Sequence, residues 1–200
     1  MDLNKYKNLL INPDRFFGSV KKEKSILKPF LFYAAVIGIF YLTSLVASMI
    51  GEIILAGIKG EPPIRMFAIT IVSGVLGFMI ALITIFISAG VLHLFITMLG
   101  GKGDYLQTFK LSCYGTVPFL FLAILNFFTI IPVLGQIILG VGLIAAVVIQ
   151  LILEVKGARV LHEMTTGRAV VAVVVIPLIL GFILFMSILA LVIIIGLGVL

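Results

Sequence analysis

Long apolar runs divide this chain of 200 residues, and short polar stretches separate them. A helix needs about 20 predominantly apolar residues to cross a bilayer, and five of the runs are long enough. They predict an all-α membrane protein, a bundle of five transmembrane helices at about 29–55, 66–99, 109–131, 133–154 and 169–200. A short amphipathic segment, residues 1–28, precedes this spanning domain of residues 29–200.

The second apolar run is long enough to raise a choice between one helix and two. Residues 66–101 contain no charged side chain. A single helix of that length would measure about 50 Å, whereas the hydrocarbon layer is about 30 Å thick. Because no turn signal lies in the middle of the run, we predict one span that is tilted or protrudes from the bilayer.

Residues 100–118 form the main polar interruption of the apolar middle of the chain. Glycines end the second span, as they commonly do at helix C-termini. Asp104 is expected to cap the next helix, with Gln107 as its partner in a capping box. Pro118 predicts a kink in the third span.

The N-terminal segment carries a second short helix signal. Asn12 followed by Pro13 is typical of an N-cap and a first helical position. Phe16 and Phe17 fall on one face of this helix, and the lysines of residues 21–24 lie elsewhere. Such a helix can lie in the headgroup plane with its aromatic side toward the lipid and its lysines near anionic headgroups. The alternative is a solvated basic anchor that only fixes the topology.

The distribution of basic residues predicts the orientation of the spans. With five spans, twelve of the fourteen basic residues lie on one side, and only Lys59 and Arg65 lie on the other. The positive-inside rule therefore favours a cytoplasmic N-terminus and a C-terminus outside, in the cell membrane if the protein is prokaryotic. The candidate surface for lipids or partners on the cytosolic side comprises Phe16, Phe17, Lys21, Lys22, Lys24, Lys102, Lys110, Lys156, Arg159 and Arg168.

Composition excludes a soluble domain. The chain is 62% hydrophobic and 11% charged, whereas soluble domains have about 25% charged residues. The net charge of +6 therefore indicates contact with membrane headgroups, and no nucleic-acid partner is predicted. Cys113 is the only cysteine, which excludes an internal disulfide and a zinc site built on thiolates.

Polar residues inside the predicted spans suggest a different class of function. They are His93, Asn126, Gln150 and Glu154. Intramembrane polar residues of this kind can form the pathway of a small transporter or channel. They can also be structural, with His93 bonded to a neighbouring helix and Glu154 paired with Arg159, Lys110 or His162. A further alternative is that Glu154 binds a cation.

No motif in the sequence assembles an active site. Residues 101–104, Gly-Lys-Gly-Asp, lack the Gly-Lys-Ser/Thr of a phosphate-binding loop. His162 and Glu163 do not form the zinc-protease pattern HExxH. We therefore predict no catalytic residue, no cofactor, no metal site and no enzymatic activity.

The order of these features resembles the Yip-one family, five-span membrane proteins named for interaction with Ypt/Rab GTPases. The resemblance is carried by NPDRFF and the lysine-rich run, GGKGDYLQTFKLSCYGTVP, IPVLGQ, and VKGARVLHEMTTGRAVVAVVVIP. It implies a helical bundle with a cytosolic N-terminus, as in relatives that bind prenylated Rab GTPases and shape membranes. The chain lacks their long N-terminal region and their Asp-Leu-Tyr-Gly-Pro motif, so it is similar to the compact prokaryotic members and Rab binding is not expected.

Together these observations predict a non-enzymatic integral membrane protein that organises membrane or recruits partners at its cytosolic face. The expected partners are anionic lipid headgroups and either other membrane proteins or further copies of the chain. A small-solute or ion transporter is the alternative. An intramembrane enzyme ranks last, because no nucleophile with a base is apparent.

Overall fold

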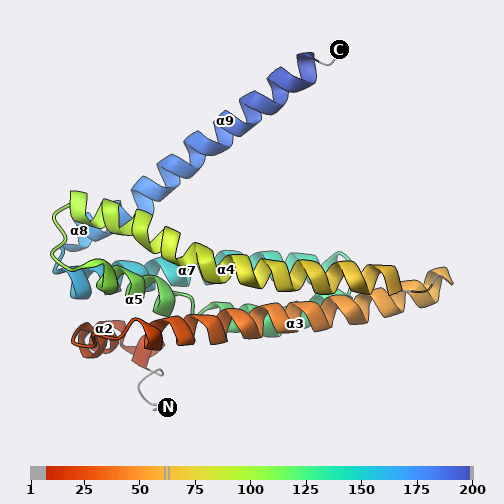
Figure 1. Ribbon diagram of the computed structural model, residues 1–200, viewed down its shortest axis with the longest axis horizontal. Helices are drawn as coiled ribbons and strands as arrows, with labels where there is room; N and C mark the ends of the chain where they lie inside the picture. The colour runs from red at the N-terminus through yellow and green to blue at the C-terminus, as the bar shows by residue number, and fades with distance from the viewer. Residues whose placement is uncertain (1–7, 61, 63, 199–200) are drawn as a thin grey trace.

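A computed structural model describes residues 8–60, 62 and 64–198 of the chain (Figure 1). The outer parts of the predicted segment 1–28 and of the predicted span 169–200 therefore lie outside the described residues. The elements are α2 (Pro13–Lys21), α3 (Leu27–Lys59), α4 (Ile64–Met98), α5 (Tyr105–Gly115), α6 (Phe119–Leu125), η1 (Asn126–Ile130), α7 (Leu134–His162), α8 (Thr166–Val170), η2 (Val171–Val175) and α9 (Ile176–Gly198).

The predicted fold class is confirmed. Five helical stretches of 25 to 33 residues are long and apolar enough to cross a membrane. Several of the helices extend beyond the predicted spans, because a helix can continue past the apolar layer with its charged residues in the headgroup region. α7, for example, continues through the charged residues that follow Glu154 and ends at His162.

The second apolar run forms one helix, as predicted. α4 contains 35 residues without a break. It lies beside α3, and the two long helices run together toward the far end of the molecule (Figure 1). α3 ends where Gly60 adopts a left-handed conformation with φ of 71°, a conformation that favours glycine at a helix C-terminus.

The third span is interrupted near Pro118, which confirms the predicted break. α5 ends at Gly115, a short turn contains the proline, and α6 begins at Phe119. The span then tightens into the 3₁₀-helix η1, which begins at Asn126. Proline causes such breaks because it removes one backbone donor and its ring collides with the preceding turn.

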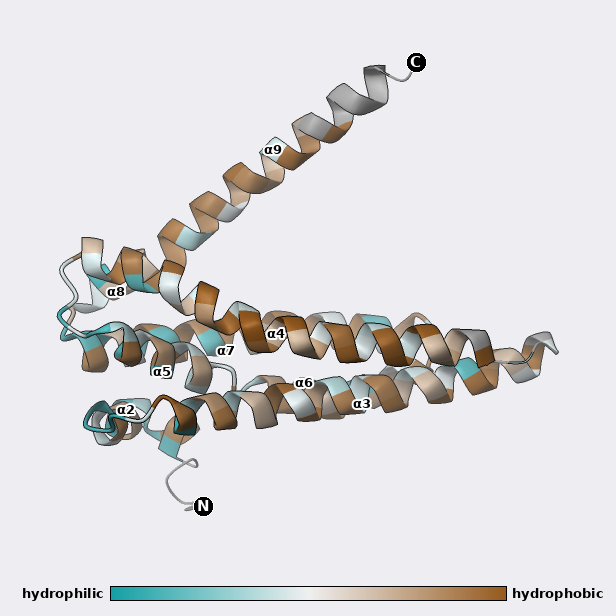
Figure 2. Cartoon of the chain, viewed as in Figure 1, coloured by the Kyte–Doolittle hydropathy of each residue, from teal (hydrophilic) through white to brown (hydrophobic). Residues whose placement is uncertain are grey.

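The last long helix leaves the bundle formed by the others. η2 is a π-helical turn, and Pro177 follows it at the start of α9. α9 then diverges from α4 and α7 (Figure 1), which agrees with the usual causes of sharp helix kinks. The side chains of residues 177–190 are all exposed, and the helix is coloured as hydrophobic over most of its length (Figure 2). Lipid is the solvent that such a surface requires.

Polar residues gather at one end of the bundle. We call this the basic end, which consists of α2, residues 100–104, the first turn of α5, the last turn of α7, and α8. Figure 2 shows the teal segments, which are hydrophilic residues, concentrated there. A cluster of buried apolar residues, to which α2, α3, α4, α5, α7, α8 and η2 all contribute, lies in the same part of the molecule. A second, smaller cluster joins α3, α4 and α5.

Candidate functional site

Helix α2 begins as predicted, but its aromatic face does not enter the lipid. The Asn12 side chain accepts a hydrogen bond from the Arg15 amide at 3.2 Å, and Pro13 is the first helical residue. Phe16 and Phe17 are only 1% and 0% exposed. This corrects the prediction that they form part of a lipid-facing surface: α2 is docked on the protein.

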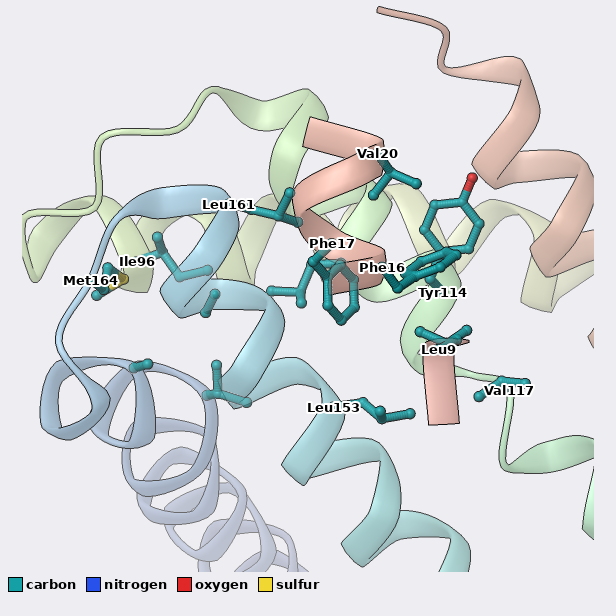
Figure 3. Close-up of a cluster of buried hydrophobic side chains, with 14 of the residues drawn as sticks. Leu9, Phe16, Phe17, Val20, Ile96, Tyr114, Val117, Leu153, Leu161 and Met164 are labelled. Atoms are coloured by element: carbon teal, nitrogen blue, oxygen red, sulfur yellow. The ribbon is translucent and has the colours of Figure 1, made fainter. Parts of the chain in front are cut away.

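Aromatic packing and a close helix approach explain why α2 docks there. The rings of Phe16 and Tyr114 lie 5.0 Å apart in an edge-to-face arrangement, which is favourable for aromatic pairs. Figure 3 shows Phe16, Phe17 and Val20 among the side chains of the bundle. At Gly157 of α7, a Cβ atom would lie 2.3 Å from Cδ1 of Leu111 and 2.9 Å from the Phe17 ring. Glycine at this position therefore allows side chains from both α5 and α2 to pack closely against α7.

Lys110 fastens the C-terminal end of α2. Its side chain is fully buried, and its Nζ donates to the carbonyl oxygens of Val20 at 2.9 Å, Lys21 at 3.4 Å and Glu23. Lys110 was predicted to lie on the exposed surface, and this expectation is wrong. A cation at the C-terminus of a helix is favourable because the last carbonyls lack intrahelical partners.

The polar start of α5 contributes to the same attachment. The Asp104 carboxylate accepts a hydrogen bond from the Gln107 amide at 3.1 Å, which confirms the predicted N-cap. The Gln107 side chain donates its Nε2 hydrogen to the Lys21 carbonyl at 2.9 Å. The Gln107 side chain was predicted to complete a capping box with Asp104, and it bonds the end of α2 and Lys110 in its place.

Lys21 connects α2 to the end of α7. Its Nζ donates to the Val160 carbonyl at 3.1 Å and to Oε1 of Glu163 at 2.8 Å. Lys102 contributes a longer ion pair, with its Nζ 4.0 Å from Oε2 of Glu163. Hydrogen bonding and charge from Lys21 lower the pKa of the exposed Glu163 carboxyl below its usual range.

The other predicted basic residues remain available at the surface. Exposed side chains belong to Lys22, Lys24, Lys102, Arg159 and Arg168, and Lys156 is partly exposed. Of the candidate surface, the structure therefore leaves these six side chains accessible and uses Phe16, Phe17 and Lys110 to hold α2 in place.

A chain of three polar side chains crosses the basic end. Nδ1 of His93 in α4 lies 2.9 Å from Oγ1 of Thr108 in α5, and that oxygen lies 3.0 Å from Nε2 of His162 in α7. A hydroxyl has one hydrogen, so Thr108 can donate to one imidazole while it accepts from the other. At Gly103, a Cβ atom would lie 2.6 Å from Nδ1 of His162. Only glycine leaves room for the ring here.

The sequence marks His93 as an intramembrane polar residue, but nothing in its spacing connects it with His162. One signal was available: these are the two histidines of the chain, and both lie close to the same predicted side of the membrane. The third member, Thr108, carries no such signal. The contact depends on α4, α5 and α7 meeting, which spacing within any one helix does not reveal.

Asn126 also joins helices. Its Nδ2 donates to the Phe40 carbonyl at 3.2 Å and to Oγ1 of Thr43 at 3.1 Å, and the residue is 2% exposed. Asn126 therefore ties η1 to α3. Interhelical bonds of this kind stabilise membrane proteins because lipid offers no alternative partner.

Gln150 and Glu154 line a cavity of about 720 Å³ within the spanning helices. Glu154 is 8% exposed, and its Oε1 accepts a hydrogen bond from Nε2 of Gln150 at 2.8 Å. In the described part of the chain no lysine, arginine or histidine forms an ion pair with Glu154, so the predicted pairing with Arg159, Lys110 or His162 is wrong. His93 and Asn126 are not among the lining residues. Of the four predicted transport residues, Gln150 and Glu154 therefore share this cavity, and the other two lie elsewhere.

The comparisons with known proteins agree with this architecture. A family model described as the Yip1 domain matches residues 7–189. The chain belongs to the Yip1 family. No curated protein and no solved structure matches the chain. The resemblance inferred from the order of motifs is thereby confirmed, and the match extends from the segment before α2 into α9.

The described residues of this Yip1 protein contain no group of three or more His, Cys, Asp or Glu side chains suited to a metal ion. The Yip1 family is not known for an enzymatic activity. Polar groups at and near the basic end form contacts between helices, through hydrogen bonds that join α2, α4, α5 and α7.

The Yip1 domain also has a shallow groove of about 390 Å³ where α7 meets α8 and η2. Its walls are mainly apolar and include Ile152 and Val170. Lys156, Arg159 and Thr166 also line it. Two cationic side chains therefore lie beside an apolar groove.

Proposed function

We propose that this Yip1 protein is a non-enzymatic membrane protein whose basic end binds anionic membrane surfaces and recruits partners from the cytosol. The N-terminus is then cytoplasmic and the C-terminus lies outside, because the positive-inside rule places the basic side in the cytosol. Binding partners are anionic headgroups together with membrane proteins or further copies of the chain.

The observation that carries this proposal is the docking of α2. Buried Phe16, Phe17 and Lys110 hold the helix against α5 and α7. Exposed Lys22 and Lys24 follow directly after α2, and exposed Lys102 lies in the adjacent loop. A fixed array of cations attracts an anionic surface at about 1 kcal/mol per basic residue near the membrane. An unstructured tail would lose part of that attraction as conformational entropy.

The groove beside Lys156 and Arg159 gives a second reason to expect lipid contacts. An acyl chain can lie along Val170 and Ile152 while the phosphate meets the two cations. The geometry supports retention of individual anionic lipids as well as attraction to a charged surface.

The direct test is capture of vesicles by the full chain reconstituted in zwitterionic nanodiscs. We expect capture of vesicles that contain phosphatidylserine and none of vesicles made of phosphatidylcholine alone. Lys22→Glu with Lys24→Glu should abolish most of the capture. The matched control, Lys59→Glu with Arg65→Glu, reverses the same number of charges near the other end of the bundle and should have no effect.

Equal capture by the two double variants would overturn the proposal, as would a probe fused after Leu200 that reports from the cytosol. If the proposal stands, crosslinking followed by mass spectrometry of the native complex would identify the protein partner. Lys21 is left unchanged in these variants, because its bond to Glu163 is part of the fold.

A transporter remains the second candidate, because Gln150 and Glu154 line a cavity inside the spanning helices. His93 and Asn126 support it less, since their side chains bond neighbouring helices. Solute flux in proteoliposomes that is lost in Glu154→Ala and retained in His93→Ala would favour this candidate. Flux no greater than that of protein-free liposomes would reject it, and flux that survives Glu154→Ala would exclude Glu154 from the pathway.

A further inference from the structure

The cavity that contains Glu154 is suited to a small molecule. It lies among α3, α4, α5 and α7, and Pro177 and Leu180 at the start of α9 complete its lining. Its volume of about 720 Å³ lies within the range of roughly 300–1,000 Å³ typical of ligand sites. The walls are mostly apolar and include Ile37, Ile85 and Leu92. These are the features of a site that holds an apolar body and fixes it with a few polar groups.

Glu154 is the one acidic side chain among the residues that line this cavity. The residue is more than nine-tenths buried, and its single hydrogen bond comes from the neutral amide of Gln150. A carboxylate inside a membrane is costly without a counter-charge. Since the described residues provide no cation for it, a positively charged ligand would satisfy the group.

Aromatic side chains share the cavity with the carboxylate. Tyr33, Tyr41 and Phe119 all contribute to the lining. Aromatic faces attract organic cations, and a desolvated site strengthens the attraction. An inorganic divalent cation fits less well, because Ca²⁺ requires six to eight oxygen ligands and Mg²⁺ keeps a shell of water. One carboxylate in an apolar cavity does not supply such a shell.

We propose that this cavity binds a lipophilic organic cation, a molecule with one ammonium group on an apolar chain. The ammonium meets Glu154 and the aromatic rings, and the apolar body lies against α3 and α4. The site is distinct from the basic end, and it does not depend on the orientation of the chain in the membrane or on binding to anionic vesicles.

The test uses three probes that share a dodecyl chain: dodecylammonium, dodecanol and dodecanoate. The full chain is reconstituted in phosphatidylcholine nanodiscs, and empty nanodiscs correct for partition into lipid. We expect saturable binding of dodecylammonium alone. Glu154→Gln preserves the shape of the side chain, and it should weaken this binding about tenfold or more, because it removes a charge-assisted hydrogen bond. Glu163→Gln, which changes an exposed carboxyl beyond the end of α7, should leave the binding unchanged.

A steric variant provides an independent arm. Thr84 lines the cavity and has an exposed side chain, so Thr84→Phe should fill the space with little effect on folding. We expect loss of dodecylammonium binding with an unchanged thermal unfolding midpoint. The proposal is overturned if dodecylammonium binds Glu154→Gln as tightly as the parent chain, if dodecanol binds equally well, or if Ca²⁺ displaces the amine. Vesicle capture measured on Glu154→Gln and Thr84→Phe reports on the basic end separately and should not change.

Discussion

The basic end and α9 show two ways in which the apolar side chains of a helix can be kept from water. At the basic end, Phe17 and Lys110 are both fully buried, and side chains from α2, α5 and α7 contact one another. Along α9 the side chains of residues 177–190 are exposed, so lipid surrounds them and the chain itself contributes little. Substitutions at the basic end should therefore change the folding stability, whereas similar substitutions in α9 should not.

The same difference separates two lysines near the basic end. The side chain of Lys102 is 76% exposed, whereas the side chain of Lys110 is buried and bonded to the carbonyls at the end of α2. Their charge is identical, but their roles differ: Lys110 holds the fold together, and Lys102 belongs to the surface proposed to meet lipid.

Phe17→Ala should have the largest effect on stability. Truncation of a buried phenylalanine costs about 3–5 kcal/mol, and here it also releases the contact with Gly157. We expect a lower unfolding midpoint in detergent and faster proteolysis of α2. Phe185→Ala in α9 is the control, because that side chain is 63% exposed and its loss should cost no more than about 0.5 kcal/mol. Equal losses would show that α2 is not docked as described.

Lys110→Met should be next in magnitude. The substitution retains the apolar part of the side chain and removes the charged donor that the carbonyls of Val20 and Glu23 share. A hydrogen bond to a charged group contributes about 1.5–3 kcal/mol, and we expect a loss of this size in equilibrium unfolding together with greater hydrogen exchange in α2. Lys102→Met removes the same charge from an exposed site. If Lys102→Met lowers the free energy of unfolding as much as Lys110→Met does, the loss of charge and not the loss of the contact with α2 would be the cause.

Thr108→Val should have a smaller effect, because it removes only one hydroxyl. The substitution keeps the shape of the side chain and breaks the bonds to both His93 and His162. Interhelical hydrogen bonds in membrane proteins contribute about 0.6 to 2 kcal/mol each. Thr97→Val provides the control, since the Thr97 hydroxyl is exposed and donates to carbonyls of its own helix. We expect Thr108→Val to lower the thermal unfolding midpoint more than Thr97→Val does. Equal midpoints would contradict a stabilising role for the contact between the helices.

Glu163→Gln should have the smallest effect, and this effect should depend on pH. Contact with Lys21 lowers the pKa of the Glu163 carboxyl in the folded protein. The stabilisation is therefore present above the usual carboxyl range and is lost as pH falls through the lowered folded pKa. We expect the parent chain to unfold at a slightly higher temperature than Glu163→Gln at neutral pH, and the difference to vanish in acid. A difference that is constant with pH would contradict the ion pair as its source.

Sequence reasoning succeeded where the signal was local. The five spanning helices, the caps at Asn12 and Asp104, and the break near Pro118 were all predicted correctly. Each depends on apolar run length or on residues within one turn of each other. The limits of the spans were less well defined, because α7 remains helical well beyond its apolar section.

The candidate site was predicted less well, because its contacts join distant parts of the chain. The amphipathic face of α2 was recognised, but a lipid surface and a protein surface favour the same aromatic pattern, so the prediction for Phe16 and Phe17 was wrong. Lys110 was placed at the headgroups on its charge alone. The carbonyls that bind it lie at the end of α2, roughly ninety residues away in the sequence.

The sequence by itself determined that the protein spans a membrane with five helices and that its cations gather on one side, since both follow from transfer of side chains between water and lipid. Only the tertiary structure decided which of those cationic side chains are accessible and which polar side chains form hydrogen bonds with one another. His93 reaches His162 through Thr108 because three helices converge, and Glu154 lines a cavity because several helices surround it. Such contacts depend on how helices pack against one another, and the periodicity of a single helix does not encode its neighbours.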